Sequence, residues 1–171
     1  MFDAGKNDVI KSILMVAMGS EKPSPAGYAE GKLTFGDFLF HYSRDGRASL
    51  SRYLGDDEIV RVPGSIRVPG EEKDRPVAFL SIGAFMQKEK VREVYLEEGI
   101  EGIGGSAFFC CPVLWEVRLP GSLQDIGEGA FFECPKLESL GVPAGVTFAG
   151  GGERDFSLIM GCYDDEGEDD A

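Results

Sequence analysis

The feature that most constrains the fold is an internal repeat of 23 residues between positions 80 and 148. Three copies follow one another without a gap, at residues 80–102, 103–125 and 126–148. A unit of this length cannot bury its apolar face alone, so the repeat predicts a solenoid of stacked coils. Seven apolar columns recur in register: Leu80, Ile103 and Ile126; Ala84, Ala107 and Ala130; Phe85, Phe108 and Phe131; Val91, Leu114 and Leu137; Val94, Val117 and Leu140; Leu96, Leu119 and Val142; Ile100, Leu123 and Val146.

Each copy contains the same succession of strand and turn. Residues 91–96 and 114–119 end in alternating apolar and polar side chains, which is typical of a short strand. Pro120 and Pro143 end the ladder pairing after equivalent strands, because proline has no N–H. The Ile-Gly-x-x-Ala-Phe segment predicts a turn in which Gly permits tight geometry, Ala permits close approach and Phe fills the interior. The repeat therefore accounts for the excess of glycine and phenylalanine, 24 and 12 of 171 residues.

Two of the copies carry a motif that resembles a known family. Residues 103–120 read IGGSAFFCCPVLWEVRLP, and residues 126–143 read IGEGAFFECPKLESLGVP. Both resemble the IGxxAFxxCxxLxxVxLP unit of BspA-type leucine-rich repeat proteins, and the 69 residues of the three copies make up 40% of the chain. The resemblance implies short strands lining one curved face and irregular or 3₁₀-like turns on the other. It also implies adhesion-like or protein-binding roles, often at a microbial surface.

We therefore expect a β-rich (α+β) solenoid, which is a short leucine-rich-repeat array with parallel strands on one face, an N-terminal hairpin cap and a short N-terminal helix. The expected segments are residues 1–32 for the helix and a linker, 33–79 for the hairpin cap and entry segment, 80–148 for the repeats, 149–163 for the C-terminal cap, and 164–171 for an acidic tail.

Local signals place turns and ends within these segments. Asp45-Gly46 predicts the turn of a hairpin over residues 42–48. The polar stretch 64–76 departs from the repeat register and predicts a loop. A stretch near the C-terminus predicts a final strand that closes the stack, and its apolar residues are Phe156, Leu158, Ile159 and Met160.

Charge and hydropathy exclude several partners. With 17 basic and 30 acidic residues the formal net charge is −13, so a nucleic-acid partner is not expected. No stretch approaches 18 consecutive apolar residues, so no membrane span is expected. Asp3 and Asp8 do not suit a positive signal-peptide n-region. The localisation stays open between cell surface or secreted, which the resemblance implies, and cytoplasmic, which the lack of a clear signal favours.

The sequence predicts no catalytic residue, no metal site and no cofactor. His41 is the only histidine, so a His-rich metal site cannot be built, and no nucleophile can be paired with it by spacing. The GxGxxA match at residues 102–107 recurs as part of the repeat, which disfavours dinucleotide binding. Cys111 and Cys134 occupy equivalent positions on adjacent coils, and we interpret them as two buried thiols, with a disulfide as the alternative.

The outward strand residues are the candidate binding site. If Val91, Val94 and Leu96 point inward, the residues between them point to solvent, and the next coil places Trp115, Glu116 and Arg118 beside them. Exposed Trp, Tyr and Arg are typical of interaction hot spots, and the strand face is the usual docking surface of a solenoid. Residues predicted to bind a protein partner are Arg92, Tyr95, Trp115, Glu116 and Arg118.

Three functions follow in order of support. The first is a non-enzymatic interaction module that binds a protein partner, of unidentified kind, through its strand face. The alternative is a structural or self-assembling scaffold with no dedicated ligand, which associates through the open ends of the solenoid. An enzyme has the weakest support, because no nucleophile, base and orienting acid can be assembled from the sequence.

Overall fold

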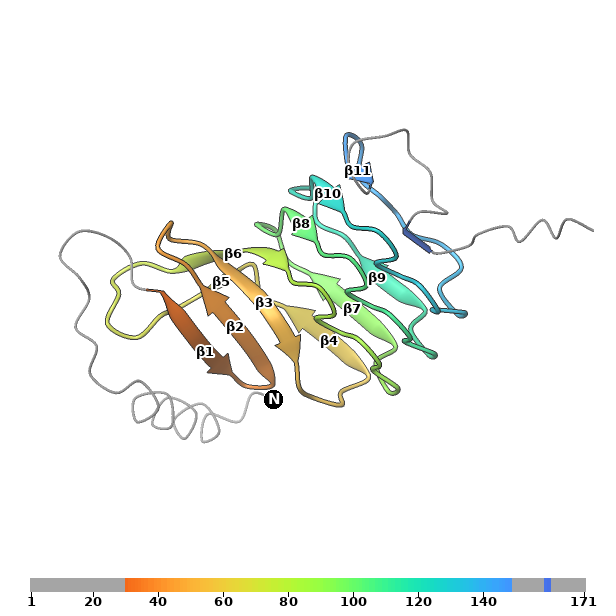
Figure 1. Cartoon of the computed structure of the whole chain (residues 1–171), viewed down its shortest axis with the longest axis horizontal. Helices are drawn as coiled ribbons and strands as arrows, with labels where there is room; N and C mark the ends of the chain where they lie inside the picture. The colour runs from red at the N-terminus through yellow and green to blue at the C-terminus, as the bar shows by residue number, and fades with distance from the viewer. Residues whose placement is uncertain (1–29, 149–158, 161–171) are drawn as a thin grey trace, which may run out of the picture.

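The computed structural model describes residues 30–148 and 159–160. This part of the chain is β-rich, and Figure 1 shows its strands following one another along an elongated array. The strands are β1 (Gly31–Phe35), β2 (Phe38–Tyr42), β3 (Ala48–Tyr53), β4 (Ile59–Val62), β5 (Ser65–Ile66), β6 (Arg75–Leu80), β7 (Glu93–Leu96), β8 (Gly102–Ile103), β9 (Glu116–Arg118), β10 (Asp125–Ile126) and β11 (Thr147–Phe148).

Two sheets run along the array. A three-stranded sheet in the order β4-β7-β9 is parallel throughout. A larger sheet has the order β1-β2-β3-β6-β8-β10-β11, with β5 paired to β6. It is antiparallel from β1 to β3 and parallel from β3 to β11. Figure 1 shows β7 and β9 in one row and β8 and β10 in another, so each coil contributes one strand to each sheet. The face expected to hold irregular or 3₁₀-like turns thus also carries short parallel strands.

A ladder of aromatic rings fills the interior between coils. Phe85, Phe108 and Phe131 are fully buried. Their ring centroids lie 5.0 Å and 5.1 Å apart in succession, with nearly parallel planes. Tyr53 of β3 continues the stack toward the N-terminal side, 5.2 Å from Phe85. This confirms the predicted phenylalanine column and shows that the hairpin cap joins the same core.

The glycine of the Ile-Gly motif marks the closest approach between coils. A Cβ atom on Gly127 would lie 2.4 Å from the backbone nitrogen of Gly105, and one on Gly104 would lie 2.7 Å from the nitrogen of Ile82. Real Cβ atoms do not approach backbone that closely, so only glycine allows the coils to pack at this spacing. The sequence motif therefore reports a contact between coils as well as a turn within one.

The predicted hairpin joins β2 and β3. Tyr42 pairs with Ala48 in antiparallel register, and the backbone N–H of Ser43 donates to the carbonyl of Arg47 over 3.0 Å. Gly46 has a φ of 84°, the left-handed conformation that this turn requires. The preceding linker ends earlier than predicted, because β1 begins at Gly31. The N-terminal helix, expected near residues 7–18, lies outside the described residues.

The interpretation of residues 64–76 as a polar loop holds for 67–74 but is wrong at both ends of the segment. The segment contains β5, which pairs with the start of β6. Ile66 and Val68 are buried, as is Arg75. The Arg75 guanidinium forms an ion pair with Glu71, donates to the Ser43 carbonyl over 2.7 Å and lies 4.8 Å from the ring centroid of Tyr42. The polar composition of the segment did not indicate this burial, because the sequence alone does not distinguish an arginine that is buried among its partners from one on the surface.

The C-terminal cap differs from the predicted closing strand. Ile159 and Met160 have helical backbone conformation, and Ile159 is fully buried. The N–H of Phe131 donates to the carbonyl of Ile159 over 2.8 Å, so this residue closes the last coil through its backbone. Phe156, Leu158 and the acidic tail at 164–171 lie outside the described residues.

Candidate functional site

The strands of the three-stranded sheet present alternate side chains to the core and to solvent. Val94, Leu96 and Val117 are buried, whereas Tyr95 is half-buried and Arg118 is exposed. Arg92 and Trp115 lie just before their strands, and the N–H of Trp115 donates to the carbonyl of Arg92 over 2.9 Å. The orientation predicted from the alternation is confirmed.

One further residue, Arg61 of β4, joins this face. It pairs in register with Tyr95, which in turn pairs with Arg118. The Arg61 Cζ atom lies 4.5 Å from the Tyr95 ring centroid, and the Arg118 Cζ atom lies 5.1 Å from it. We call these three side chains the Arg–Tyr–Arg row. The position of Arg118 beside the outward residues of the preceding coil was expected, whereas the participation of Arg61 was missed.

Ion pairs and hydrogen bonds hold the other charged groups of this face. Arg118 Nε donates to Glu116 over 2.7 Å, and the Glu116 carboxylate raises the pKa of Arg118. The Tyr95 hydroxyl donates to Glu93 over 2.6 Å, and this bond raises the pKa of Tyr95 above its ordinary value. These contacts orient the side chains, and the exposed pairs add little to stability.

A groove of about 1190 Å³ lies beside the row. Four of the five predicted binding residues line it, and these are Arg92, Trp115, Glu116 and Arg118. Tyr95 is not part of the lining and reaches the groove through its contact with Arg118. The Trp115 side chain is half exposed, at 50%. The third coil contributes Lys136, Glu138, Ser139 and Gly141 to the same wall.

The groove combines an exposed aromatic ring with charges of both signs. Arg92 pairs with Glu58 over 3.5 Å, and Lys90 pairs with Asp56 over 3.3 Å. Lys136 adds a further cation to the groove lining. Such a surface can bury one apolar or aromatic group against Trp115 while its rim forms hydrogen bonds and ion pairs.

Cys111 and Cys134 are buried free thiols in this structure. Each Sγ donates to the carbonyl of a ladder phenylalanine, Cys111 to Phe85 over 3.1 Å and Cys134 to Phe108 over 3.0 Å. The hydrogen-bonding contact with Cys111 and burial raise the pKa of Cys134 far above its usual range. Cys134 is therefore a protonated packing group. Both thiols are buried in the core, in agreement with the preferred interpretation.

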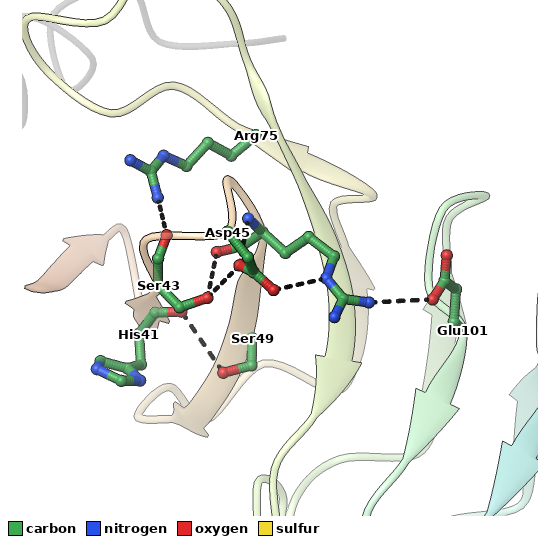
Figure 2. A network of polar contacts seen from close by, with 7 residues as sticks. His41, Ser43, Asp45, Ser49, Arg75 and Glu101 are labelled. Carbon is green, nitrogen blue, oxygen red and sulfur yellow. Dashed lines mark hydrogen bonds and ion pairs between the residues drawn. The ribbon is translucent and has the colours of Figure 1, made fainter. Parts of the chain in front are cut away.

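Figure 2 shows the polar network around the single histidine. The imidazole of His41 points away from Ser49 and Asp45, and the Ser49 hydroxyl donates to the backbone carbonyl of His41 over 3.5 Å. Hydrogen bonds from Ser43 and then from Arg47 lower the pKa of Asp45 to about 2. The network fastens the hairpin tip, and Arg47 extends it to Glu101 over 3.6 Å.

Residues 30–148 and 159–160 contain neither a candidate metal site nor a candidate membrane-spanning helix. No group of three or more His, Cys, Asp or Glu side chains there is arranged to hold a metal ion. The same residues include no helix that is long and apolar enough to cross a membrane.

Comparisons with known proteins agree with the repeat. The family model described as "BspA type Leucine rich repeat region (6 copies)" matches residues 76–153. A leucine-rich repeat protein from Bacteroides capillosus ATCC 29799 is similar at 26% identity and a TM-score of 0.67, over 78% of this chain and 94% of the other. The T. pallidum leucine-rich repeat protein is 25% identical with a TM-score of 0.60, over 75% of this chain and 54% of that one.

A third solved structure shares the fold at lower identity. It is a leucine-rich cell surface protein from Faecalibacterium prausnitzii A2-165, 23% identical with a TM-score of 0.62, over 71% of this chain and 33% of the other. The search of curated proteins gave no match.

Proposed function

We propose that this chain, whose residues 76–153 form a BspA-type leucine-rich repeat region, is a non-enzymatic module that binds a protein partner through its strand face. The observation that carries the proposal is the half-exposed Trp115 in a groove bordered by Arg92 and Arg118. Aromatic and arginine side chains supply most of the energy at protein interfaces when they lie at the centre of a patch. The role would be adhesion-like, and the family resemblance favours a secreted or surface location.

The groove supports a protein ligand better than a small molecule. Its walls come from three successive coils, and charged residues of both signs line it. Small-molecule sites are typically enclosed, mostly apolar cavities, which this groove does not resemble. The backbone around Trp115 is fixed by pairing with the coil before it, so the surface is preformed. A preformed surface loses little conformational entropy on binding, which favours affinity.

Partner capture by a double variant tests the proposal. Trp115→Ala combined with Arg118→Ala removes the aromatic anchor and the adjacent guanidinium, and we expect capture from the native host to be abolished while the far-UV CD spectrum stays native. A matched control combines Ile82→Ala with Arg44→Ala, one exposed apolar residue and one exposed arginine from outside the groove. Unchanged capture by the first variant, or equal loss in both, contradicts the proposal.

Self-assembly is the second candidate, and one observation favours it. Within the described residues, β1 stands at the edge of the larger sheet, and its Phe35 side chain is 46% exposed. Exposed edge strands pair with strands of other chains. Sedimentation at increasing concentration separates the two candidates, because a strict monomer at high concentration excludes assembly through this edge.

A further inference from the structure

The Arg–Tyr–Arg row brings together residues from three different coils. Arg61 lies on β4, Tyr95 on β7 and Arg118 on β9, in one register across the parallel sheet. The two arginines come from opposite neighbours of the tyrosine strand, so one guanidinium approaches the ring from each side. Stacking on an aromatic ring restricts the arginine side chain and leaves its N–H donors free to point outward.

Most N–H donors of the two guanidiniums form no hydrogen bond with the described residues. Arg118 uses Nε for Glu116, and its terminal nitrogens form no hydrogen bond or ion pair with residues 30–148 or 159–160. Arg61 forms no ion pair with a carboxylate among residues 30–148 and 159–160, and its guanidinium stacks on the Tyr95 ring. A guanidinium with free donors in a fixed plane is suited to a bidentate bond with a carboxylate.

Neighbouring acids are already engaged and leave the row able to accept an anion. Glu116 is bound by Arg118, and Glu93 accepts the hydroxyl hydrogen of Tyr95. Both acids lie two residues before the row along their strands. Within the part of the chain that the structure describes, Arg61 is therefore a cation without a paired carboxylate, on the edge strand β4 of this sheet.

The spacing of the row specifies the shape of a ligand. Arg61 and Arg118 are separated by two strand intervals, which is about 9.5 Å. In a polyproline-II segment, residues i and i+3 project from the same side and are separated by about 9.3 Å. In an extended strand the residues on one side lie about 6.6 Å or 13 Å apart, which does not match. A single phosphate is too small to reach both guanidiniums.

We propose that the Arg–Tyr–Arg row binds an acidic polyproline-II segment of a protein partner, with carboxylates at positions i and i+3 paired to Arg61 and Arg118. The proposal deepens the interaction function proposed above and rests on it. Tyr95 is a positioning residue that holds the two guanidiniums at the spacing of the ligand. The segment crosses the strands, and its chain continues toward the groove at Trp115, three residues before Arg118 in the sequence.

Binding of three capped, fluorescein-labelled peptides to the full chain tests the proposal by anisotropy. The peptides carry Glu-Pro-Pro-Glu, Glu-Pro-Pro-Pro-Glu, which moves the second acid off the shared face, and Gln-Pro-Pro-Gln, which removes both charges. We expect the first to bind about tenfold more tightly than the others, because bidentate charge-assisted pairs are the strong polar contacts. Arg61→Ala and Arg118→Ala should each remove most of this difference.

Two control variants identify the role of each group. Arg44→Ala removes an exposed arginine of the hairpin tip and should leave peptide binding unchanged. Tyr95→Leu keeps both charges and removes the stack. We expect this variant to lose the difference in affinity between the two acidic peptides while it still binds both of them. Far-UV CD shows whether each variant is folded.

Several results overturn the proposal. These are equal binding of the two acidic peptides, equal binding of the glutamine peptide, binding unaffected by Arg61→Ala, no binding of any peptide, or displacement of the peptide by inorganic phosphate at equal concentration. If Arg61→Ala leaves partner capture intact while Trp115→Ala with Arg118→Ala abolishes it, the strand-face function stands and the peptide assignment fails.

Discussion

Truncation of one ring of the aromatic ladder, Phe108→Ala, should destabilise the protein more than deletion of a ring that lies outside the ladder. Phe108 is fully buried and stacks on a ring on each side, at 5.0 Å and 5.1 Å. A buried Phe→Ala change costs about 3–5 kcal/mol, and each aromatic contact adds about 0.5–1.5 kcal/mol beyond burial. We expect a loss of about 5 kcal/mol, equivalent to a fall in Tm of about 10–20 °C for a chain of this size.

Urea unfolding followed by far-UV CD and by Trp115 emission measures this loss. Trp115 is the only tryptophan and lies in the same coil as Phe108, so its emission reports locally. Both probes are needed because repeat arrays can unfold one part at a time. The matched control is Phe109→Ala, which removes a half-buried ring with one partner, Phe132, at 5.6 Å. If both variants lose the same free energy of unfolding, the buried ladder ring stabilises the array no more than the half-buried Phe109 does, and the prediction is refuted.

Three further predictions use the same structure. Gly127→Ala places a Cβ 2.4 Å from the Gly105 nitrogen and should lower the free energy of unfolding in urea by about 3 kcal/mol. The control Gly141→Ala, whose Cβ has nothing within 4 Å, should leave this free energy unchanged. Equal losses in both variants would contradict the close approach of the coils at Gly127. Arg75→Met leaves the half-buried Glu71 without its partner and should lower the free energy of unfolding by about 3–5 kcal/mol. Arg44→Met, which breaks the exposed pair with Glu30, should lower it less, and thermal unfolding of the two variants measures the difference. The pKa of Asp45, measured by carbon-detected NMR, should be about 2 and should move toward 3.8 in Ser43→Ala. Because the folded-state pKa is depressed, the contribution of Asp45 to stability is present above pH 3.8 and is lost as the pH falls toward 2. A pKa near 3.8 in the native chain would refute the hydrogen-bond network.

The repeat made the array predictable, because each coil buries equivalent residues in equivalent places. The register of Phe85, Phe108 and Phe131 led directly to the ring ladder, and the alternation at residues 91–96 led to the outward orientation of Tyr95. Periodicity is a strong signal wherever a residue is surrounded by copies of its own environment.

Prediction failed where that periodicity breaks. Arg61 lies 34 residues before Tyr95, not 23, because the segment 64–76 is inserted between the coils. The alternation in Ile59-Val60-Arg61-Val62 was the available signal for an additional strand of the same sheet. The pairing of buried Arg75 with Glu71 could not be inferred, since it depends on the hairpin tip folding over that segment.

The backbone bonds between coils have a mechanical consequence. The N–H of Phe85 donates to Ala107, that of Phe108 to Ala130 and that of Phe131 to Ile159, so each coil is fastened to the one that follows. A force that separates the ends of the array would act on these layers in series and would detach coils one after another. Each 23-residue coil would release about 75 Å of extended chain in place of a layer about 5 Å thick. Under such a load we expect the length of the array to increase in steps, one coil at a time.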